Sequence, residues 1–134
     1  MKALKARATR GLPKGTLVTV CDNSGAKIIR IISVKHFKAV KGRYPSAGIG
    51  DLIKASVVKG TPEMRKQVVD AVIVRQKKEY RRPDGTRISF EDNAAVVLKD
   101  DKARTPKGTI FKGPVAKEAA ERWPGIAKVA GVIV

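Results

Sequence analysis

Short apolar and alternating stretches recur along the first hundred residues and predict β-strands. They lie at 16–21, 27–34, 51–58, 68–74, 86–90 and 94–98. In the stretch 51–58, Ile53, Ala55 and Val57 share one face, which is typical of a half-buried strand. The stretch 68–74 is almost wholly apolar, which indicates a strand buried on both faces.

A charged ribbon follows the apolar strand at 68–74. Its outgoing limb carries basic residues on both alternating faces, so it has no face to lay on a core. The tetrapeptide 82–85, Arg-Pro-Asp-Gly, suits a type I turn, with Pro second and Gly fourth. Residues 75–90 are therefore predicted to form a hairpin that projects beyond the core.

Near the C-terminus the spacing of apolar residues changes from the alternation of a strand to the period of a helix. Ala116, Ala119, Ala120 and Trp123 follow a helical stripe, which Pro124 ends. A second short helix is expected from the stripe of four apolar residues that follows it. These residues are Ile126, Val129, Ala130 and Ile133.

These elements describe a mainly β chain with a helical end. An open antiparallel sheet of this size exposes two edges, and closing it into a barrel removes them. We predict one domain over 1–134: a small closed five-stranded antiparallel β-barrel with a projecting basic hairpin and two short C-terminal helices. A basic arm is expected at 1–15, the barrel at 16–100 with its hairpin at 75–90, and a loop and the helices at 101–134.

Composition supports strands and excludes several classes of protein. The chain has 16 Val and 11 Ile but 5 Leu, and no apolar run long enough to cross a bilayer. The single cysteine, Cys21, cannot form an internal disulfide, which fits a reducing compartment. With one histidine, His36, it cannot supply the usual four ligands of zinc. No cofactor, metal or membrane association is expected, and the localisation expected is cytoplasmic.

The net charge of +17 changes the picture most, because it calls for a polyanionic partner. It is concentrated in the arm at 1–15, in the acid-free stretch 27–43 and in the hairpin, whereas residues 117–128 carry only +1. From charge we expect phosphate contacts at the following basic residues: Lys2, Lys5, Arg7, Arg10, Lys14, Arg30, Lys35, Lys38, Lys41, Arg43, Lys54, Lys59, Arg75, Lys77, Lys78 and Lys107.

The kind of nucleic acid follows from what the chain lacks. No long basic helix is present to enter a major groove, and the six aromatic residues are too few for a stacking platform on the strands. Recognition of a folded RNA by shape and phosphate fits better.

Two alternatives stay open on the residues alone. A free RNA-binding chaperone with a barrel fold is one, although its strands would be expected to carry more aromatics. A small cysteine enzyme is the other, with Cys21 as nucleophile and His36 as base. Cys21 ends an apolar strand, however, and is more simply a small buried hydrophobe. We therefore expect no enzyme activity.

Several ordered motifs resemble one known family. They are Cys21 to Lys27 (CDNSGAK), Gly50 to Val57 (GDLIKASV), Ala71 to Val74 with Asp84-Gly85 and Phe90 downstream, and Gly108 to Ala116 (GTIFKGPVA). Together they resemble the universal large-subunit ribosomal protein L-fourteen family over residues 12–134. The insertion 61–66 and the ending 119–124 are similar to its archaeal and eukaryotic branch, and the short arm favours the archaeal form.

The resemblance implies a structural constituent of the large ribosomal subunit that binds 23S-type rRNA. It also implies bridges to small-subunit rRNA, contacts with neighbouring large-subunit proteins and docking of the anti-association initiation factor six. Carried over residue by residue, it adds the matched turn and hairpin to the rRNA contacts: Asn23, Ser24, Lys27, Arg81, Arg82 and Arg87. The expected protein-facing and bridge-facing residues are Pro114, Lys117, Glu121, Arg122, Trp123, Lys128 and Val134.

Overall fold

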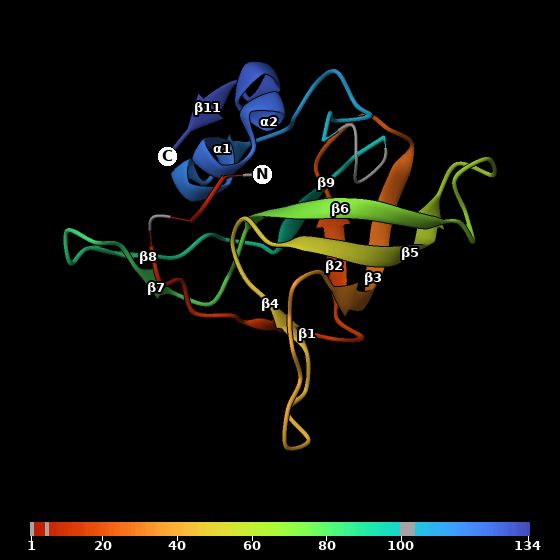
Figure 1. Ribbon diagram of the computed structural model, residues 1–134. Coiled ribbons are helices and arrows are strands. Elements are labelled where there is room, and N and C mark those ends of the chain that lie inside the picture. The colour runs from red at the N-terminus through yellow and green to blue at the C-terminus, as the bar shows by residue number, and fades with distance from the viewer. Residues whose placement is uncertain (1, 5, 100–103) are drawn as a thin grey trace.

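The computed structural model describes residues 2–4, 6–99 and 104–134. Five strands within these ranges form a closed barrel in the order β2-β3-β5-β6-β9, as predicted (Figure 1). Their bounds are Leu17–Val20 for β2, Ala26–Val34 for β3, Leu52–Gly60 for β5, Val68–Arg75 for β6 and Ala94–Val97 for β9. Lys5 and the expected boundary at 100/101 lie outside the described residues.

The pairing that closes the barrel corrects the prediction of a wholly antiparallel sheet. Strands β2 and β9 run parallel, with Thr19 opposite Ala94 and Val20 opposite Ala95. The other four pairings are antiparallel. Direction alternates from strand to strand around the barrel, so an odd number of strands must bring two parallel strands together where it closes.

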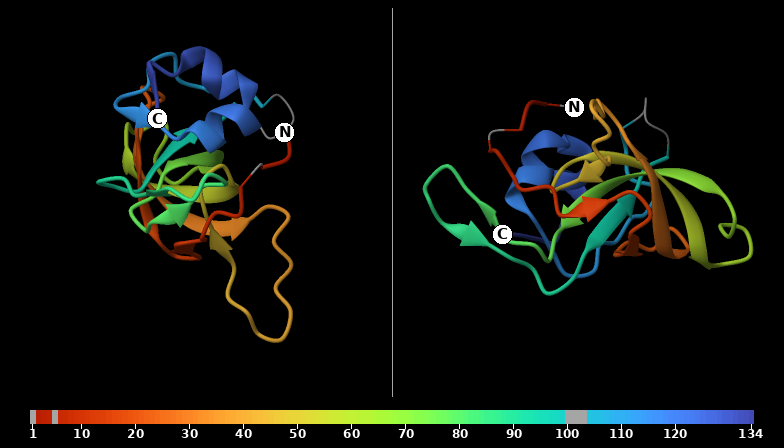
Figure 2. Two further views of the ribbon diagram at one scale, coloured as in Figure 1. Left: turned by 90° about the vertical axis from the view of Figure 1, so that its left-hand side faces the viewer. Right: turned by 90° about the horizontal axis from the view of Figure 1, so that it is seen from below.

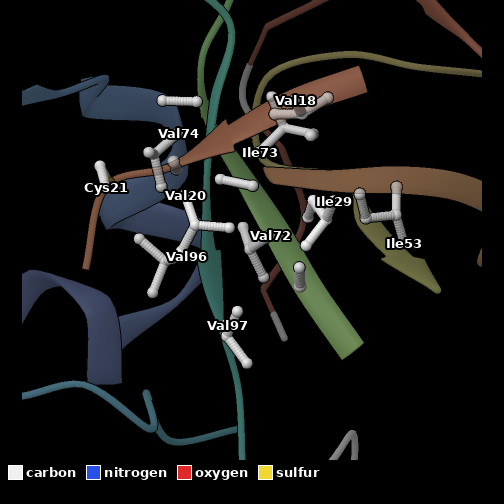
Figure 3. Packing of buried hydrophobic residues seen from close by; sticks show 14 of the residues in the cluster. Val18, Val20, Cys21, Ile29, Ile53, Val72, Ile73, Val74, Val96 and Val97 are labelled. Atoms are coloured by element: carbon white, nitrogen blue, oxygen red, sulfur yellow. The ribbon is translucent and has the colours of Figure 1, made fainter. Parts of the chain in front are cut away.

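The barrel interior is filled by small aliphatic side chains. Residues 71–74 of β6 and 94–97 of β9 have no exposed surface, whereas residues 53–57 of β5 alternate between buried and half-buried positions. Figure 3 shows Val18, Ile53 and Val72 among the side chains gathered in this core. The excess of Val and Ile thus supplies side chains that suit the narrow space inside a small barrel.

Two segments project from the barrel (Figures 1 and 2). One is the loop that leaves β3 and returns through β4, Ser46–Ala47, to β5. The other is the predicted hairpin, with the short strands β7, Tyr80–Arg81, and β8, Arg87–Ile88. Its turn closes with a 2.9 Å hydrogen bond from the Gly85 amide to the Arg82 carbonyl, and Gly85 has a φ of 93°.

The sequence predicted that the outgoing limb of the hairpin has no face that packs on a core. This prediction is wrong at the base of the hairpin. Its base contains Gln76 and Tyr80, neither of which has any exposed surface. Tyr80 is buried because its ring and hydroxyl face the C-terminal region, where the hydroxyl donates to Glu118 at 2.8 Å. Only the outer part of the ribbon is left to solvent.

The C-terminal region contains the two expected helices, α1 at Lys117–Arg122 and α2 at Pro124–Val129. Trp123 and Ile126 are buried on the shared apolar stripe. The expected continuation of the second helix to Ile133 is wrong. After Ala130 the chain is extended, and β11, Val132–Ile133, pairs in parallel with β10, Pro114–Val115, whose open edge supplies backbone partners.

The N-terminal arm lies along the molecule. The amide of Lys2 donates to the Arg122 carbonyl at 3.0 Å, and β1, Leu12–Pro13, pairs with β4 through Leu12 and Ala47. Figure 1 shows the red arm running between these two attachments. None of the described helices is long and apolar enough to cross a membrane.

Candidate nucleic-acid interface

Buried and half-buried carboxylates are largely neutralised from within the molecule. Asp51 pairs with Arg122 at 3.1 Å, Asp70 with Lys54 at 3.1 Å, and Asp92 with Arg75 at 2.9 Å. In each pair at least one side chain is nearly buried: Asp51 is 14% exposed, Asp70 is 12% exposed and Arg75 is 9% exposed. Among the described residues, the exposed cations outnumber the exposed carboxylates that could pair with them.

Most of the predicted phosphate contacts are exposed. The following have no ion-pair partner among the described residues: Lys2, Arg7, Lys14, Lys27, Arg30, Lys38, Lys41, Arg43, Lys59, Lys77, Lys78, Arg81 and Lys107. They lie on the arm, on the outer surface of the barrel and on the two projecting segments. Uncompensated cations at projecting positions are what phosphate binding requires.

The loop at 35–50 is the most extended of these surfaces. Its path depends on left-handed backbone at His36, Lys41 and Gly42, whose φ values are 63°, 58° and 74°. Lys38, Lys41 and Arg43 are all exposed on it. In Figure 2 this orange loop reaches well away from the barrel, so its cations can approach a separate, large surface.

Arg10 lies where the arm meets this loop. Its guanidinium carbon stands 5.1 Å from the centre of the Phe37 ring, within the range of a cation–π contact. Its Nε also lies 3.8 Å from an Asp51 oxygen. Arg10 therefore links the arm, the loop and the barrel, and half of its side chain is still exposed.

Arg75, one of the expected phosphate contacts, is a structural cation. Its guanidinium pairs with Asp92 and donates to the carbonyls of Lys112 and Pro114 at 2.8 and 3.0 Å. A Cβ on Gly113 would lie 2.6 Å from its Nη1, so the glycine makes room for it. Burial and four hydrogen bonds to three protein partners leave Arg75 unavailable to a phosphate group.

Arg82 also has an internal role. Its Nε donates to Glu118 at 2.7 Å and its Nη2 to the Val134 carbonyl at 2.6 Å. The hydrogen bond that it donates to Glu118 raises the pKa of Arg82. Burial, aided by the bond to Glu118, raises the pKa of the Tyr80 hydroxyl well above its usual range. Its neighbour Arg81 is exposed and remains a candidate phosphate contact.

The remaining cations of the hairpin and barrel are partly compensated. Arg87 faces Glu79 at 3.2 Å with both side chains more than half exposed, an arrangement that contributes little to stability. Lys54 is half-buried against Asp70. Lys35 is half-buried and also has interactions within the protein.

Asn23 and Ser24 lie in a turn that is tied to the closing segment of the chain. Asn23 Oδ1 accepts the Thr109 amide at 2.8 Å, and its Nδ2 donates to Thr109 Oγ1. Asp22 accepts the amide and hydroxyl of Ser24 and, through its other oxygen, the Val97 amide at 2.9 Å. Both residues thus have structural partners, a role that their place in a turn motif did not reveal.

The set expected to face proteins or the bridge divides in two. Lys117, Glu121, Lys128 and Val134 are exposed, and Pro114 is half-buried. Trp123 belongs to the core instead: it is 1% exposed, and its indole N–H donates to the Gly50 carbonyl at 2.9 Å. Arg122 is committed to Asp51 beside it.

Exposed aliphatic side chains extend this C-terminal surface. Val132 and Ile133 are 57% and 49% exposed on β11. Sequence reasoning placed Ile133 on a buried helical stripe, because the strand partner that turns it outward is not visible in a local pattern.

Cys21 is a buried hydrophobe. It is 4% exposed, and burial raises the pKa of its thiol to about 11. The thiol is therefore protonated at neutral pH, contrary to what a nucleophilic cysteine requires.

Comparison with known proteins agrees with the motifs. Residues 11–134 match the family model described as ribosomal protein L14p/L23e. Proteins named large ribosomal subunit protein uL14 are similar over their full length: that of Halorubrum lacusprofundi is 56% identical over 134 residues, with 100% of both chains covered. Those of Methanococcus vannielii and Haloarcula marismortui are each 54% identical, with 99% and 100% of both chains covered. The chain therefore belongs to the ribosomal protein L14p/L23e family, in agreement with the resemblance of its motifs.

Proposed function

We propose that this chain is a structural constituent of the large ribosomal subunit that binds large-subunit rRNA. The observation that carries the proposal is the division of its charges: Asp51, Asp70, Asp92 and Glu118 are paired within the molecule, whereas exposed cations gather on the arm, the loop at 35–50 and the hairpin. The names of the archaeal relatives supply the ribosomal setting.

Binding is proposed to act through phosphates. Arg7, Lys38, Lys41, Arg43 and Arg81 are exposed on segments that leave the barrel from different sides. Such contacts fix position and orientation on a folded RNA without reading its bases. The rigid barrel holds the segments at fixed separations, so the match is to the shape of the RNA.

The C-terminal surface is proposed to serve other partners. It carries Lys117, Glu121 and Lys128 near the exposed aliphatic strand β11, so it mixes charge of both signs with apolar area. This composition suits neighbouring ribosomal proteins and the anti-association initiation factor six better than bare phosphate. A bridge to small-subunit rRNA and a place in cytoplasmic ribosomes complete the proposal.

Titration of purified full-length chain against large-subunit rRNA at rising salt tests the proposal. Replacing Lys38, Lys41 and Arg43 by Gln removes three loop charges, and the same change at Lys112, Lys117 and Lys128 removes three from the C-terminal region. The loop variant is expected to lower the salt slope by about 2–3, because fewer counterions are released. Equal losses in the two variants, or none in the loop variant, would contradict it.

A further inference from the structure

A cavity of about 560 Å³ lies between the N-terminal arm and the barrel. Leu4, Ala6, Arg7, Ala8 and Arg10 of the arm line one side, and Val34, Ile49 and Arg122 line others. Its volume falls within the range of roughly 300–1,000 Å³ that small-molecule sites have. It is large enough for a ligand of the size of one nucleotide.

The walls of this cavity are fixed by hydrogen bonds at both ends of the arm. At one end the Lys2 amide donates to the Arg122 carbonyl at 3.0 Å. At the other, the buried side chain of Gln76 donates to the Thr9 carbonyl at 2.8 Å, just before the pairing of Leu12 with Ala47. The cavity is therefore part of the fold and not a gap beneath a loose tail.

Charge around the cavity favours an anion. Arg7, Arg10, Lys35 and Arg122 contribute cations, against the single carboxylate of Asp51. Asp51 is already occupied by Arg122 at 3.1 Å. Arg7 is exposed and has no ion-pair partner within the described ranges. The Nε of Arg122 is a buried donor for which those ranges provide no acceptor.

Aliphatic groups also line the cavity. Leu4, Ala6 and Ala8 of the arm are half-buried and give it an apolar wall that a simple inorganic anion would not use. Val34 and Ile49 lie deeper and are 8% and 1% exposed. A nucleotide combines the two features, because its phosphate is anionic and its base and ribose present apolar faces. Among the described lining residues no Phe, Tyr or Trp is present, and the imidazole of the exposed His36 is the ring that this lining offers to a base.

We propose that this cavity receives one nucleotide extruded from the rRNA strand, with its phosphate at Arg7 and its base or ribose against Leu4 and Ala8. The inference rests on the proposed binding of rRNA. It adds a discrete pocket for a single nucleotide to contacts that otherwise involve only the RNA backbone.

Chemical probing of rRNA in large subunits that carry the full-length chain tests this inference. Arg7→Gln removes the cavity's exposed cation, and Lys112→Gln removes an equal charge from an exposed position outside the cavity. Ala8→Leu narrows the cavity without changing charge, and Ala39→Leu is its control in the exposed loop. Thermal melting of each variant checks that it folds.

We expect one nucleotide, or two adjacent ones, to become several-fold more reactive in both cavity variants and to stay protected in both controls. The inference is overturned if no nucleotide responds to Arg7→Gln, or if the same nucleotides respond equally to Lys112→Gln. It is also overturned if a folded Ala8→Leu variant leaves the nucleotide protected, because the contact then lies outside the cavity. Sedimentation of the wild-type chain with large subunits is scored separately: absence there refutes the proposed function itself.

Discussion

The carboxylate of Glu118 on helix α1 lies 2.7 Å from the Nε of Arg82 in the hairpin turn. The two side chains are 6% and 15% exposed, and the same carboxylate accepts the hydroxyl of the buried Tyr80 at 2.8 Å. This relationship joins the projecting hairpin to the C-terminal region. It makes one arginine of an adjacent pair structural and leaves the other, Arg81, to solvent.

Replacement of Glu118 by Ala is expected to lower the free energy of unfolding by about 3 kcal/mol, because it leaves Arg82 half-buried without its counter-ion. Tyr80 also loses its acceptor. Urea denaturation followed by circular dichroism measures the change. Glu121→Ala on the same helix is the matched control, and its exposed carboxylate should contribute less than about 0.5 kcal/mol. Similar losses in the two variants would show that the Arg82 pair is not structural.

Arg81→Gln and Arg82→Gln are expected to separate binding from folding. Arg81→Gln should melt like the wild type but reduce the salt slope of rRNA binding by about 1, because one phosphate contact is lost. Arg82→Gln should instead lower the melting temperature, since Glu118 is left buried without a cation. The interpretation fails if Arg81→Gln destabilises the fold or if it binds rRNA with an unchanged slope.

The stability of the wild type is expected to fall as the pH rises from about 9 to about 11. Burial raises the pKa of Cys21 from 9.0 to about 11, so across this window the unfolded chain has lost a proton that the folded chain retains. The contribution of this thiol is therefore fully present below pH 9 and is lost above it, by roughly 2–3 kcal/mol. Unfolding at several pH values should show this difference between the wild type and Cys21→Ala. Parallel curves for the two proteins would refute the buried, protonated thiol.

Asn23→Ala should destabilise the chain by about 1–2 kcal/mol, because the Thr109 amide and hydroxyl lose their partner. Thermal melting measures the effect. Asn93→Ala is not a suitable control, because the Asn93 side chain itself accepts a hydrogen bond from the Lys77 amide. Thr109→Val supplies the comparison, since it removes only the hydroxyl bond. An unchanged melting temperature in Asn23→Ala would return this residue to the candidate RNA contacts.

The barrel could be predicted because its signals are local. Alternation at 51–58 and the apolar runs at 68–74 and 94–98 specify which faces are buried, and the observed strands coincide with them to within two residues. The parallel closure of β2 on β9 could also have been deduced from the odd strand number. Local patterning does not show this, because it depends on how the strands are arranged around the barrel.

The roles of individual charged residues could not be predicted in the same way. The sequence alone does not distinguish the three arginines of the basic hairpin, Arg75, Arg81 and Arg82. They differ because Asp92 pairs with Arg75 and Glu118 pairs with Arg82. Both carboxylates lie far along the chain from the arginine that they bind, so the local pattern does not show the pairing. Trp123 and Ile133 changed roles for a similar reason: the Gly50 carbonyl holds one inside, and pairing with β10 turns the other out.

The central claim is that the exposed cations place this chain in the large subunit. Sedimentation of native lysate at low magnesium and low salt, with the chain detected by blotting, tests it most directly, because the two subunits then separate. We expect to find the chain in the large-subunit peak and to see it released as the salt concentration rises, since its contacts are to phosphates. A chain that remains at the top of the gradient, free of large subunits under these conditions, would contradict it.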